Sequence, residues 1–206
     1  MIKAKHHTVI YPMFKMLTRF LMRRRFASAR INGDFSDSGH AVLVISNHIS
    51  WWDGFWMMHL NLKRLNRKFH FMMLENQLQK HWYFQYSGAY SVRKNSRSLL
   101  ESLDYTTDLL EEKQTMAFMF PQGKIHSMHQ HSIHFEKGIE RILRNCPSET
   151  QVIFSVNMVD YFSDAKPHLS MSIQQHKAGD FQTTSVERAY QTFYNQVMNQ
   201  QKTITS

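Results

Sequence analysis

A histidine and an aspartate lie five residues apart, His48 and Asp53, directly after the short aliphatic run Ala41 to Ile45. Imidazole titrates near neutral pH, so His48 can act as a general base. If the turn folds back onto the ring, Asp53 would fix its tautomer and stabilise the imidazolium. A substrate that brings its own hydroxyl needs no nucleophilic serine. The competing interpretation is a helix N-terminus at which Asp53 is a capping residue and His48 is incidental.

Two further polar stretches border predicted strands, and they favour the catalytic interpretation of His48 and Asp53. With them the sequence resembles the glycerophospholipid acyltransferase family, which includes the 1-acylglycerol-3-phosphate acyltransferases. The first block of that family, N-H-x-x-x-x-D, is matched by Asn47, His48 and Asp53. Its third block, F-P-E-G-T-R-S, is represented here by Phe120, Pro121, Gln122, Gly123, Lys124, Ile125 and His126. The order and spacing of several blocks are more specific than any one motif.

The second block, G-x-I-F-I-D-R, has the spacing of Gly88 to Lys94, with Arg93 one position ahead of the arginine of the family. Phe135 and Gly138 are similar to a phenylalanine and a glycine that follow the third block. The resemblance spans residues 40–160. It implies substrate-binding roles for the following residues: Asn47, Arg93, Lys94, Phe120, Pro121, Gln122, Gly123 and Lys124.

The resemblance also implies a reaction. A fatty acyl group would pass from acyl-CoA or acyl carrier protein to the hydroxyl of a lipid acceptor. His48 would remove the proton of that hydroxyl, Asp53 would orient His48, and backbone amides near Gly123 would stabilise the oxyanion. No metal, redox cofactor or covalent acyl-enzyme is implied.

Four departures from the family pattern bear on the acceptor. Gln122 replaces a glutamate, Ile125 an arginine, Lys124 a threonine and Lys94 the arginine of the second block. The fourth block is poorly matched by Val152–Val159, which lacks a proline. The pair His48 and Asp53 is intact, so we expect an active enzyme whose acceptor is a lysophospholipid, a lyso-aminolipid or another lipid. A pseudoenzyme with this fold is the alternative.

The basic residues of the altered blocks have two interpretations. Arg93, Lys94 and Lys124 would bind phosphate oxygens of the acceptor or of the donor. Otherwise they form a solvated rim. A denser run, Lys63 to Lys68, is interpreted first as a solvated face and second as a membrane-facing patch.

The chain of 206 residues has 25 Lys+Arg against 16 Asp+Glu, a net charge of +9, which favours anionic partners. A non-catalytic nucleic-acid-binding domain is therefore a rival class. We expect no nucleic-acid partner, because no helix-turn-helix, zinc-finger or RNP signature is found. One cysteine, Cys146, excludes an intramolecular disulfide framework and indicates a reducing compartment. It precedes Pro147 without a local base, which argues against a thiolate nucleophile.

Four histidines fall within nine residues, at His126, His129, His131 and His134. Histidine-rich tracts can bind Zn²⁺ or Ni²⁺. This tract lacks an H-E-x-x-H pattern and contains no cysteine, so we predict no metal site.

Strand-like and helix-like segments alternate, which predicts one α/β domain over residues 1–206 with a mixed, largely parallel sheet flanked by helices. The motif-bearing core is expected over 40–160, after an amphipathic basic N-terminal segment over 1–30. The predicted strands are Ala41–Ser46, Phe69–Leu74, Tyr90–Val92, Thr115–Phe120, Gln151–Val159 and, at an edge, Leu169–Gln174. The predicted helices are Tyr11–Phe26, Trp52–Asn61, Ser98–Glu112, Lys137–Arg144 and Thr183–Asn199.

The helix expected over Tyr11–Phe26 has apolar residues at intervals of three and four, and five basic residues. It either lies in the headgroup layer of a membrane or packs on the core. No apolar run approaches the roughly 18–20 residues of a spanning helix, and no signal peptide is recognised. We expect a cytoplasmic protein that is peripheral on the inner face of the cell membrane. Trp51 and Trp52 line an acyl pocket, anchor the interface or pack in the core, the last being favoured.

Overall fold

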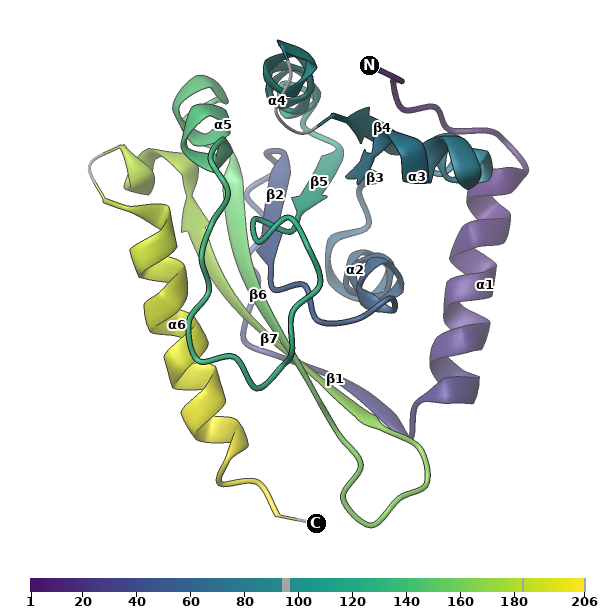
Figure 1. Ribbon diagram of the computed structural model, residues 1–206, viewed down its shortest axis with the longest axis vertical. Coiled ribbons are helices and arrows are strands. Elements are labelled where there is room, and N and C mark those ends of the chain that lie inside the picture. The colour runs from purple at the N-terminus through teal and green to yellow at the C-terminus, as the bar shows by residue number, and fades with distance from the viewer. Residues whose placement is uncertain (94–96, 183, 206) are drawn as a thin grey trace.

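The computed structural model describes residues 1–93, 97–182 and 184–205, and shows an α/β fold (Figure 1). Seven strands form one sheet in the order β1-β7-β6-β2-β5-β3-β4. Strands β6, β2, β5, β3 and β4 run parallel, and β7 is antiparallel to β6 but parallel to β1. The strands are β1 (Ser28–Asn32), β2 (Val42–Ser46), β3 (Lys68–Leu74), β4 (Ala89–Val92), β5 (Thr115–Met119), β6 (Gln151–Asp160) and β7 (His168–Lys177).

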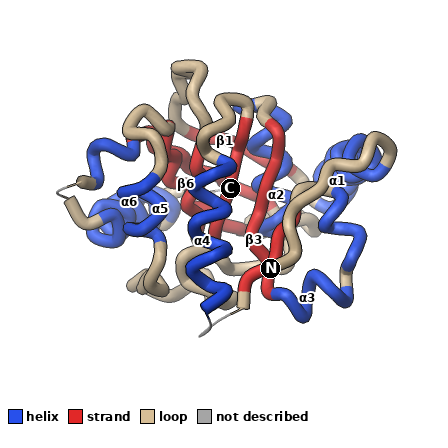
Figure 2. Tube along the Cα trace, turned by 90° about the horizontal axis from the view of Figure 1, so that it is seen from above, coloured by secondary structure: helices blue, strands red, loops and turns tan. Residues whose placement is uncertain are grey.

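Helices cover both faces of the sheet (Figure 2). They are α1 (Ile10–Arg25), α2 (Asp53–Leu60), α3 (Glu75–Lys80), α4 (Arg97–Leu109), α5 (Ile139–Asn145) and α6 (Val186–Gln201). A π-helical turn, Asn61–Leu65, extends α2, and a 3-10 helix, Trp82–Tyr86, follows α3. Another 3-10 turn, Ala178–Phe181, follows β7.

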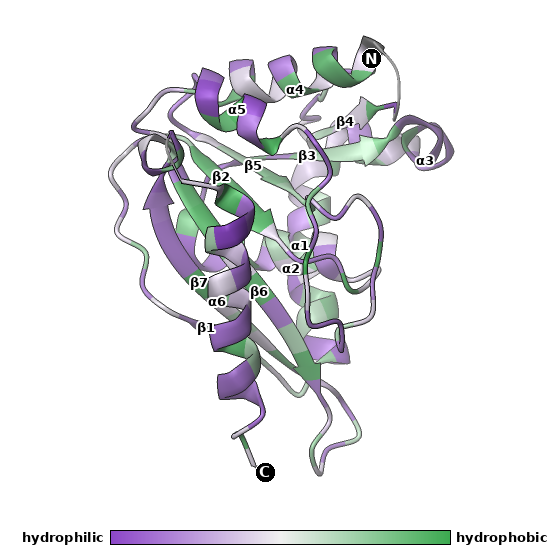
Figure 3. Cartoon of the chain, turned by 60° about the vertical axis from the view of Figure 1, so that its left-hand side comes forward, coloured by the Kyte–Doolittle hydropathy of each residue, from purple (hydrophilic) through white to green (hydrophobic). Residues whose placement is uncertain are grey.

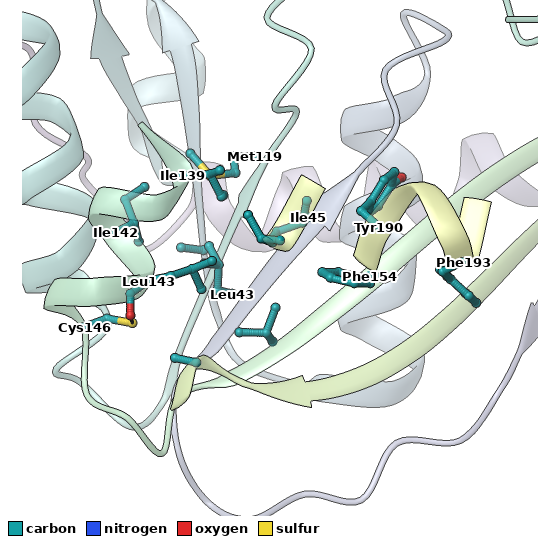
Figure 4. Close-up of a cluster of buried hydrophobic side chains, with 14 of the residues drawn as sticks. Leu43, Ile45, Met119, Ile139, Ile142, Leu143, Cys146, Phe154, Tyr190 and Phe193 are labelled. Atoms are coloured by element: carbon teal, nitrogen blue, oxygen red, sulfur yellow. Dashed lines mark hydrogen bonds between the residues drawn. The ribbon is translucent and has the colours of Figure 1, made fainter. Parts of the chain in front are cut away.

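Two apolar layers result, because successive side chains of a strand point to opposite faces. Leu43 and Ile45 of β2 pack with Phe154, Tyr190 and other residues on the side of α4, α5 and α6 (Figure 4). Val42 and Val44 pack on the opposite side with residues of α1 and α2. In Figure 3 the hydrophobic colour is concentrated in inner strands such as β2.

The predicted α/β class and the mixed, mostly parallel sheet are confirmed, and each predicted helix and strand is present within a few residues of its expected bounds. Residue 183, the expected start of the last helix, lies outside the described residues. The prediction of Leu169–Gln174 as an edge strand is wrong. Strand β7 lies between β1 and β6, and the edges are β1 and β4. Strand β1 and helix α3 were not predicted.

The N-terminal helix packs on the core through a different stripe from the one the sequence singled out. Phe14, Thr18 and Met22 are buried, whereas Met13, Met16, Leu17 and Phe20 are exposed. Packing on the core is therefore confirmed for one stripe of the helix, and the membrane interpretation of the exposed stripe stays a prediction. Among the described residues, no helix combines the length and apolarity that crossing a bilayer requires.

From the sequence, the basic run Lys63 to Lys68 is interpreted first as a solvated face. The structure shows that this run is not uniformly exposed. Arg67 is buried and forms an ion pair with Asp37, and its backbone amide donates to the side-chain oxygen of Asn61 at 2.8 Å. Lys68 is exposed and pairs with Glu112 at 3.5 Å. The charge of this run is thus partly used to hold the turn before β3.

Candidate active site

His48 and Asp53 meet in the turn between β2 and α2. The Nδ1 atom of His48 lies 2.7 Å from Oδ2 of Asp53. Because a carboxylate oxygen accepts hydrogen bonds, the ring proton belongs on Nδ1, and Nε2 keeps a lone pair. The His48 side chain is 23% exposed and Asp53 is fully buried. This geometry is that of a general base held by an acid.

The turn itself is closed by Asp53. Its Oδ2 also accepts the backbone amides of Ile49 at 2.8 Å and Ser50 at 3.0 Å. Burial raises the pKa of Asp53, and the hydrogen bonds from His48, Ser50 and Ile49 oppose that rise. From the sequence, two roles for Asp53 compete: capping the N-terminus of a helix and orienting the ring of His48. The same carboxylate oxygen holds the turn and the ring.

The third block covers one face of the His48 ring. Phe120, directly after β5, stacks on the imidazole with ring centroids 4.2 Å apart and planes at 8°. Gln122 is buried, and its side-chain oxygen accepts the backbone amide of His48 at 2.7 Å. The amide of His126 donates to the His48 carbonyl at 2.9 Å. Phe120 and Gln122, expected at substrate-binding positions, therefore contact His48 itself.

Backbone geometry explains why a glycine, Gly123, occupies the turn after β5. Gly123 has φ of 67°, in the left-handed region that favours glycine. Its amide donates to the Phe120 carbonyl at 3.1 Å, so it is engaged within the turn. The amides of Lys124 and Ile125 have no hydrogen-bond partner among the residues the structure describes. Pro121 is buried, and its carbonyl accepts the amide of Glu136 at 2.7 Å.

Asn47 is tied to strand β6 in a network that the sequence did not reveal. Its side chain donates to the Asn157 carbonyl at 2.9 Å and accepts the Asn157 amide at 2.8 Å. The Asn157 side chain donates to Ser46 Oγ at 2.9 Å and accepts from Ser155 at 3.1 Å. All four residues are fully buried. The one signal in the sequence was an asparagine within the apolar run Val152–Val159.

The second block lies further along the sheet, because β5 and β3 separate β4 from β2. Gly88, with φ of 101°, brings β4 so close to β3 that a Cβ atom would lie 1.9 Å from the Phe69 carbonyl oxygen. Arg93 forms an ion pair with Glu75, which also accepts from Ser91 Oγ at 2.9 Å. This pair lines an open cleft of about 500 Å³. Lys94 lies outside the described residues.

The remaining candidates are not gathered at His48 in the same way. Lys124 and Ile125 are exposed. Among the described residues, no three His, Cys, Asp or Glu side chains are grouped so that they could hold a metal ion, the histidine tract from His126 to His134 included. Cys146 is buried, and burial raises the pKa of its thiol. The raised pKa argues against a thiolate nucleophile at Cys146.

The mixed α/β sheet thus places a histidine–aspartate pair directly after a buried central strand. A family model described as Acyltransferase matches residues 28–159, more than half of the chain. The chain belongs to the acyltransferase family. No curated protein matches it.

Proposed function

We propose that this acyltransferase moves a fatty acyl group from acyl-CoA or acyl carrier protein to the hydroxyl of a membrane lipid. The hydrogen bond between His48 Nδ1 and Asp53 Oδ2 carries the proposal, because it leaves Nε2 as the base. As the acceptor oxygen attacks the thioester carbonyl, its proton passes to Nε2. Collapse of the tetrahedral intermediate expels the thiolate, which takes that proton. The products are an ester and a free thiol.

The oxyanion of the intermediate needs donors near the third block. The Gly123 amide serves the turn, so the amides of Lys124 and Ile125 are the better candidates for this role. Backbone donors that are already fixed can lower such a barrier by several kcal/mol, about 2.7–4 for one donor.

The acceptor is proposed to be a lysophospholipid, a lyso-aminolipid or another lipid with a free hydroxyl. Glu75 neutralises Arg93, the one described basic residue of the second block. Lys124 is exposed and is the proposed cation for a phosphate of the acceptor or donor. This distribution supports an acceptor that is less anionic than a lysophosphatidate.

We propose that the enzyme is peripheral on the inner face of the cell membrane. Acyl-CoA and acyl carrier protein are water-soluble donors, whereas the acceptor resides in a bilayer. The exposed apolar and basic residues of α1 support peripheral attachment.

The decisive test is His48→Ala, with the exposed His129→Ala as the matched control. We expect His48→Ala to lose at least about 10²-fold in transfer from an acyl thioester, the least that a general base usually contributes. Its circular dichroism and melting temperature should stay unchanged. Mass spectrometry of lipids from cells with and without the protein would identify the acceptor, as a missing diacyl species beside its accumulating monoacyl precursor.

A folded His48→Ala protein with full activity would refute the mechanism. Absence of transfer by the wild type with every thioester donor would favour the pseudoenzyme. Tight, sequence-selective binding of duplex DNA without vesicle binding would favour the nucleic-acid-binding alternative.

A further inference from the structure

Large apolar side chains are exposed along the edge of the sheet that carries His48. The loops after β2, β5 and β6 and the last residue of β3 display the following side chains: Trp51, Leu74, Ile125, Tyr161 and Phe162. Trp51 is 68% exposed and Tyr161 is 59% exposed. The sequence favoured core packing for Trp51, which is wrong. Apolar groups gathered beside a site mark a surface that meets a partner.

Helix α1 presents a second exposed apolar surface. Met16 and Phe20, four residues apart and therefore on one face, are 64% and 57% exposed. The buried residues Phe14, Thr18 and Met22 lie on the opposite side of the helix. The outer stripe is thus left uncovered by the same packing that attaches α1 to the core.

Ring contacts connect the His48 edge of the sheet to the C-terminal end of α1. Phe26, the next residue, packs its ring against Trp52 at 5.5 Å, and Trp52 packs against Trp51 at 5.3 Å. The amide of Ala27 donates to the carbonyl of Pro167 in the hairpin that joins β6 to β7, at 2.9 Å. Figure 1 shows this hairpin beside the end of α1.

The tip of the hairpin is held in place. His168 binds Ser28 of β1 through Nδ1 at 2.9 Å and Asp164 through Nε2 at 2.7 Å. Phe162 has φ of 48°, a left-handed conformation that is strained for an aromatic residue. Such strain persists only where the surroundings impose it, and it is found at functional sites. The Phe162 ring also lies against the ring of His168, with centroids 5.5 Å apart, so it is held at the tip.

Charge favours a lipid partner for this surface. Helix α1 has five basic residues and no acidic one: Lys15, Arg19, Arg23, Arg24 and Arg25. The four arginines have no ion-pair partner among the described residues. A second copy of the same helix would be repelled, whereas an anionic headgroup layer would be attracted by about 1 kcal/mol per basic residue.

We propose that Met16, Phe20, Trp51, Tyr161 and Phe162 form one docking surface for an anionic bilayer, and that it holds the His48 edge of the sheet against the headgroups. The inference rests on the proposed function, in which the acceptor lies in the bilayer. Aromatic rings are stable at the headgroup level. His48, three residues before Trp51, then lies at the depth where a lipid hydroxyl is found. The acceptor reaches the base without leaving the membrane.

Tryptophan fluorescence tests this orientation directly, with vesicles of brominated phosphatidylcholine and a minority of phosphatidylglycerol. Trp82 is a matched probe, because it is 60% exposed but lies outside the docking surface. We expect strong quenching in Trp82→Phe, which retains Trp51, and at least a twofold smaller effect in Trp51→Phe. Equal quenching in both variants, or none in either, would overturn the proposal.

Vesicle flotation of the 206-residue chain provides the second arm. Tyr161→Ser with Phe162→Ser should reduce binding about tenfold, because two large apolar groups no longer enter the interface. Leu100→Ser is the control, since Leu100 is equally exposed but lies on α4. Loss of binding only in the control, or unchanged binding in the hairpin variant, would contradict the proposal. So would capture by neutral and anionic vesicles alike.

These measurements are independent of the chemistry. His48→Ala should bind the same vesicles as strongly as the wild type. If docking follows the expected pattern but no acyl transfer is found, the proposed function fails while the docking surface stands. If transfer is found and the docking variants bind normally, the docking surface fails while the proposed function stands.

Discussion

His48 owes its chemical character to contacts on three sides. Asp53 binds Nδ1, Phe120 covers one ring face, and Gln122 holds the backbone amide. The first contact directs the lone pair of Nε2 outward. The second places an aromatic face where the positive charge of an imidazolium develops during the reaction. Substituting Gln for the glutamate of the family keeps an oxygen acceptor at the His48 amide without adding a negative charge.

The contribution of Phe120 can be measured separately. Phe120→Leu should lower kcat about 3- to 10-fold and leave KM nearly unchanged, because the ring stabilises an imidazolium that forms during the reaction and is absent when substrate binds. Phe120→Tyr, which keeps the aromatic face, should retain the wild-type kcat. Steady-state kinetics with a soluble short-chain acceptor is the measurement. A rise in KM alone would instead assign Phe120 to substrate binding.

At the scale of elements, strands β2 and β6 place the pair through a buried polar connection. Asn47 uses its whole amide on the backbone of Asn157, so the turn that starts at His48 begins from a fixed point. A buried amide network of this kind is stabilising only while every member is satisfied.

Asn47→Ala should therefore destabilise the protein by about 2–4 kcal/mol, because the amide and carbonyl of Asn157 would be buried without partners. Transfer activity should fall as well, since His48 loses its fixed point. The control is Asn32→Ala, where the side chain donates to Ser170 at 3.0 Å in an exposed position. Urea unfolding of both variants gives the comparison, and an equal effect of the two would contradict the argument.

Strand β3 adds a dependence of stability on pH. His70 is buried, both of its ring nitrogens lack partners among the described residues, and burial lowers its pKa to about 3. The ring of His6 lies 4.7 Å away, and Lys68 is also nearby. Between pH 6.5 and about 3 the unfolded chain binds a proton at His70 that the folded chain does not. The free energy of unfolding should consequently fall as the pH falls through this range.

His70→Leu should flatten that dependence. The slope of the unfolding free energy against pH should decrease by up to one proton, about 1.4 kcal/mol per pH unit. Urea denaturation at several pH values between 4 and 7 measures it. An unchanged slope in the variant would assign the acid sensitivity to other groups, with His6 as the next candidate.

How far the sequence predicted these elements depends on the range of the interactions. Apolar spacing predicted α1, α2, α4 and the inner strands, because burial on both faces leaves a local pattern. It missed β1, whose partner β7 lies 140 residues away, and whose exposed and half-buried residues carry no apolar run. The His48 and Asp53 contact followed from a five-residue spacing. The Asn157 and Glu75 contacts did not, because they join distant segments.

For the whole molecule, α1 is both a core helix and an outer surface. Removing Tyr11–Phe26 would take away Phe14 and Met22 and expose the apolar layer against which they pack. A truncated protein therefore cannot distinguish loss of membrane attachment from loss of folding. Single substitutions on the buried and exposed faces of α1 can distinguish the two. This dual role also explains why amphipathicity alone left two interpretations open.

Met22→Ala should cost about 2–4 kcal/mol in unfolding free energy, because Met22 is 4% exposed. Met16→Ala, on the same helix, should stay within about 0.5 kcal/mol. Thermal or urea unfolding of the two variants is the check. Equal losses would mean that the outer stripe of α1 is covered by another part of the protein.

The pairing of β1 with β7 also determines the order in which the chain can fold as it is made. Ser28 has its partner His168 140 residues later, so β1 has no neighbouring strand until those residues have been translated. At about 5–20 residues per second, that interval is roughly 7–28 seconds. During it the nascent N-terminal segment carries two uncovered apolar stripes and five positive charges outside the ribosome. The newly synthesised chain can therefore reach a bilayer surface before its sheet is complete.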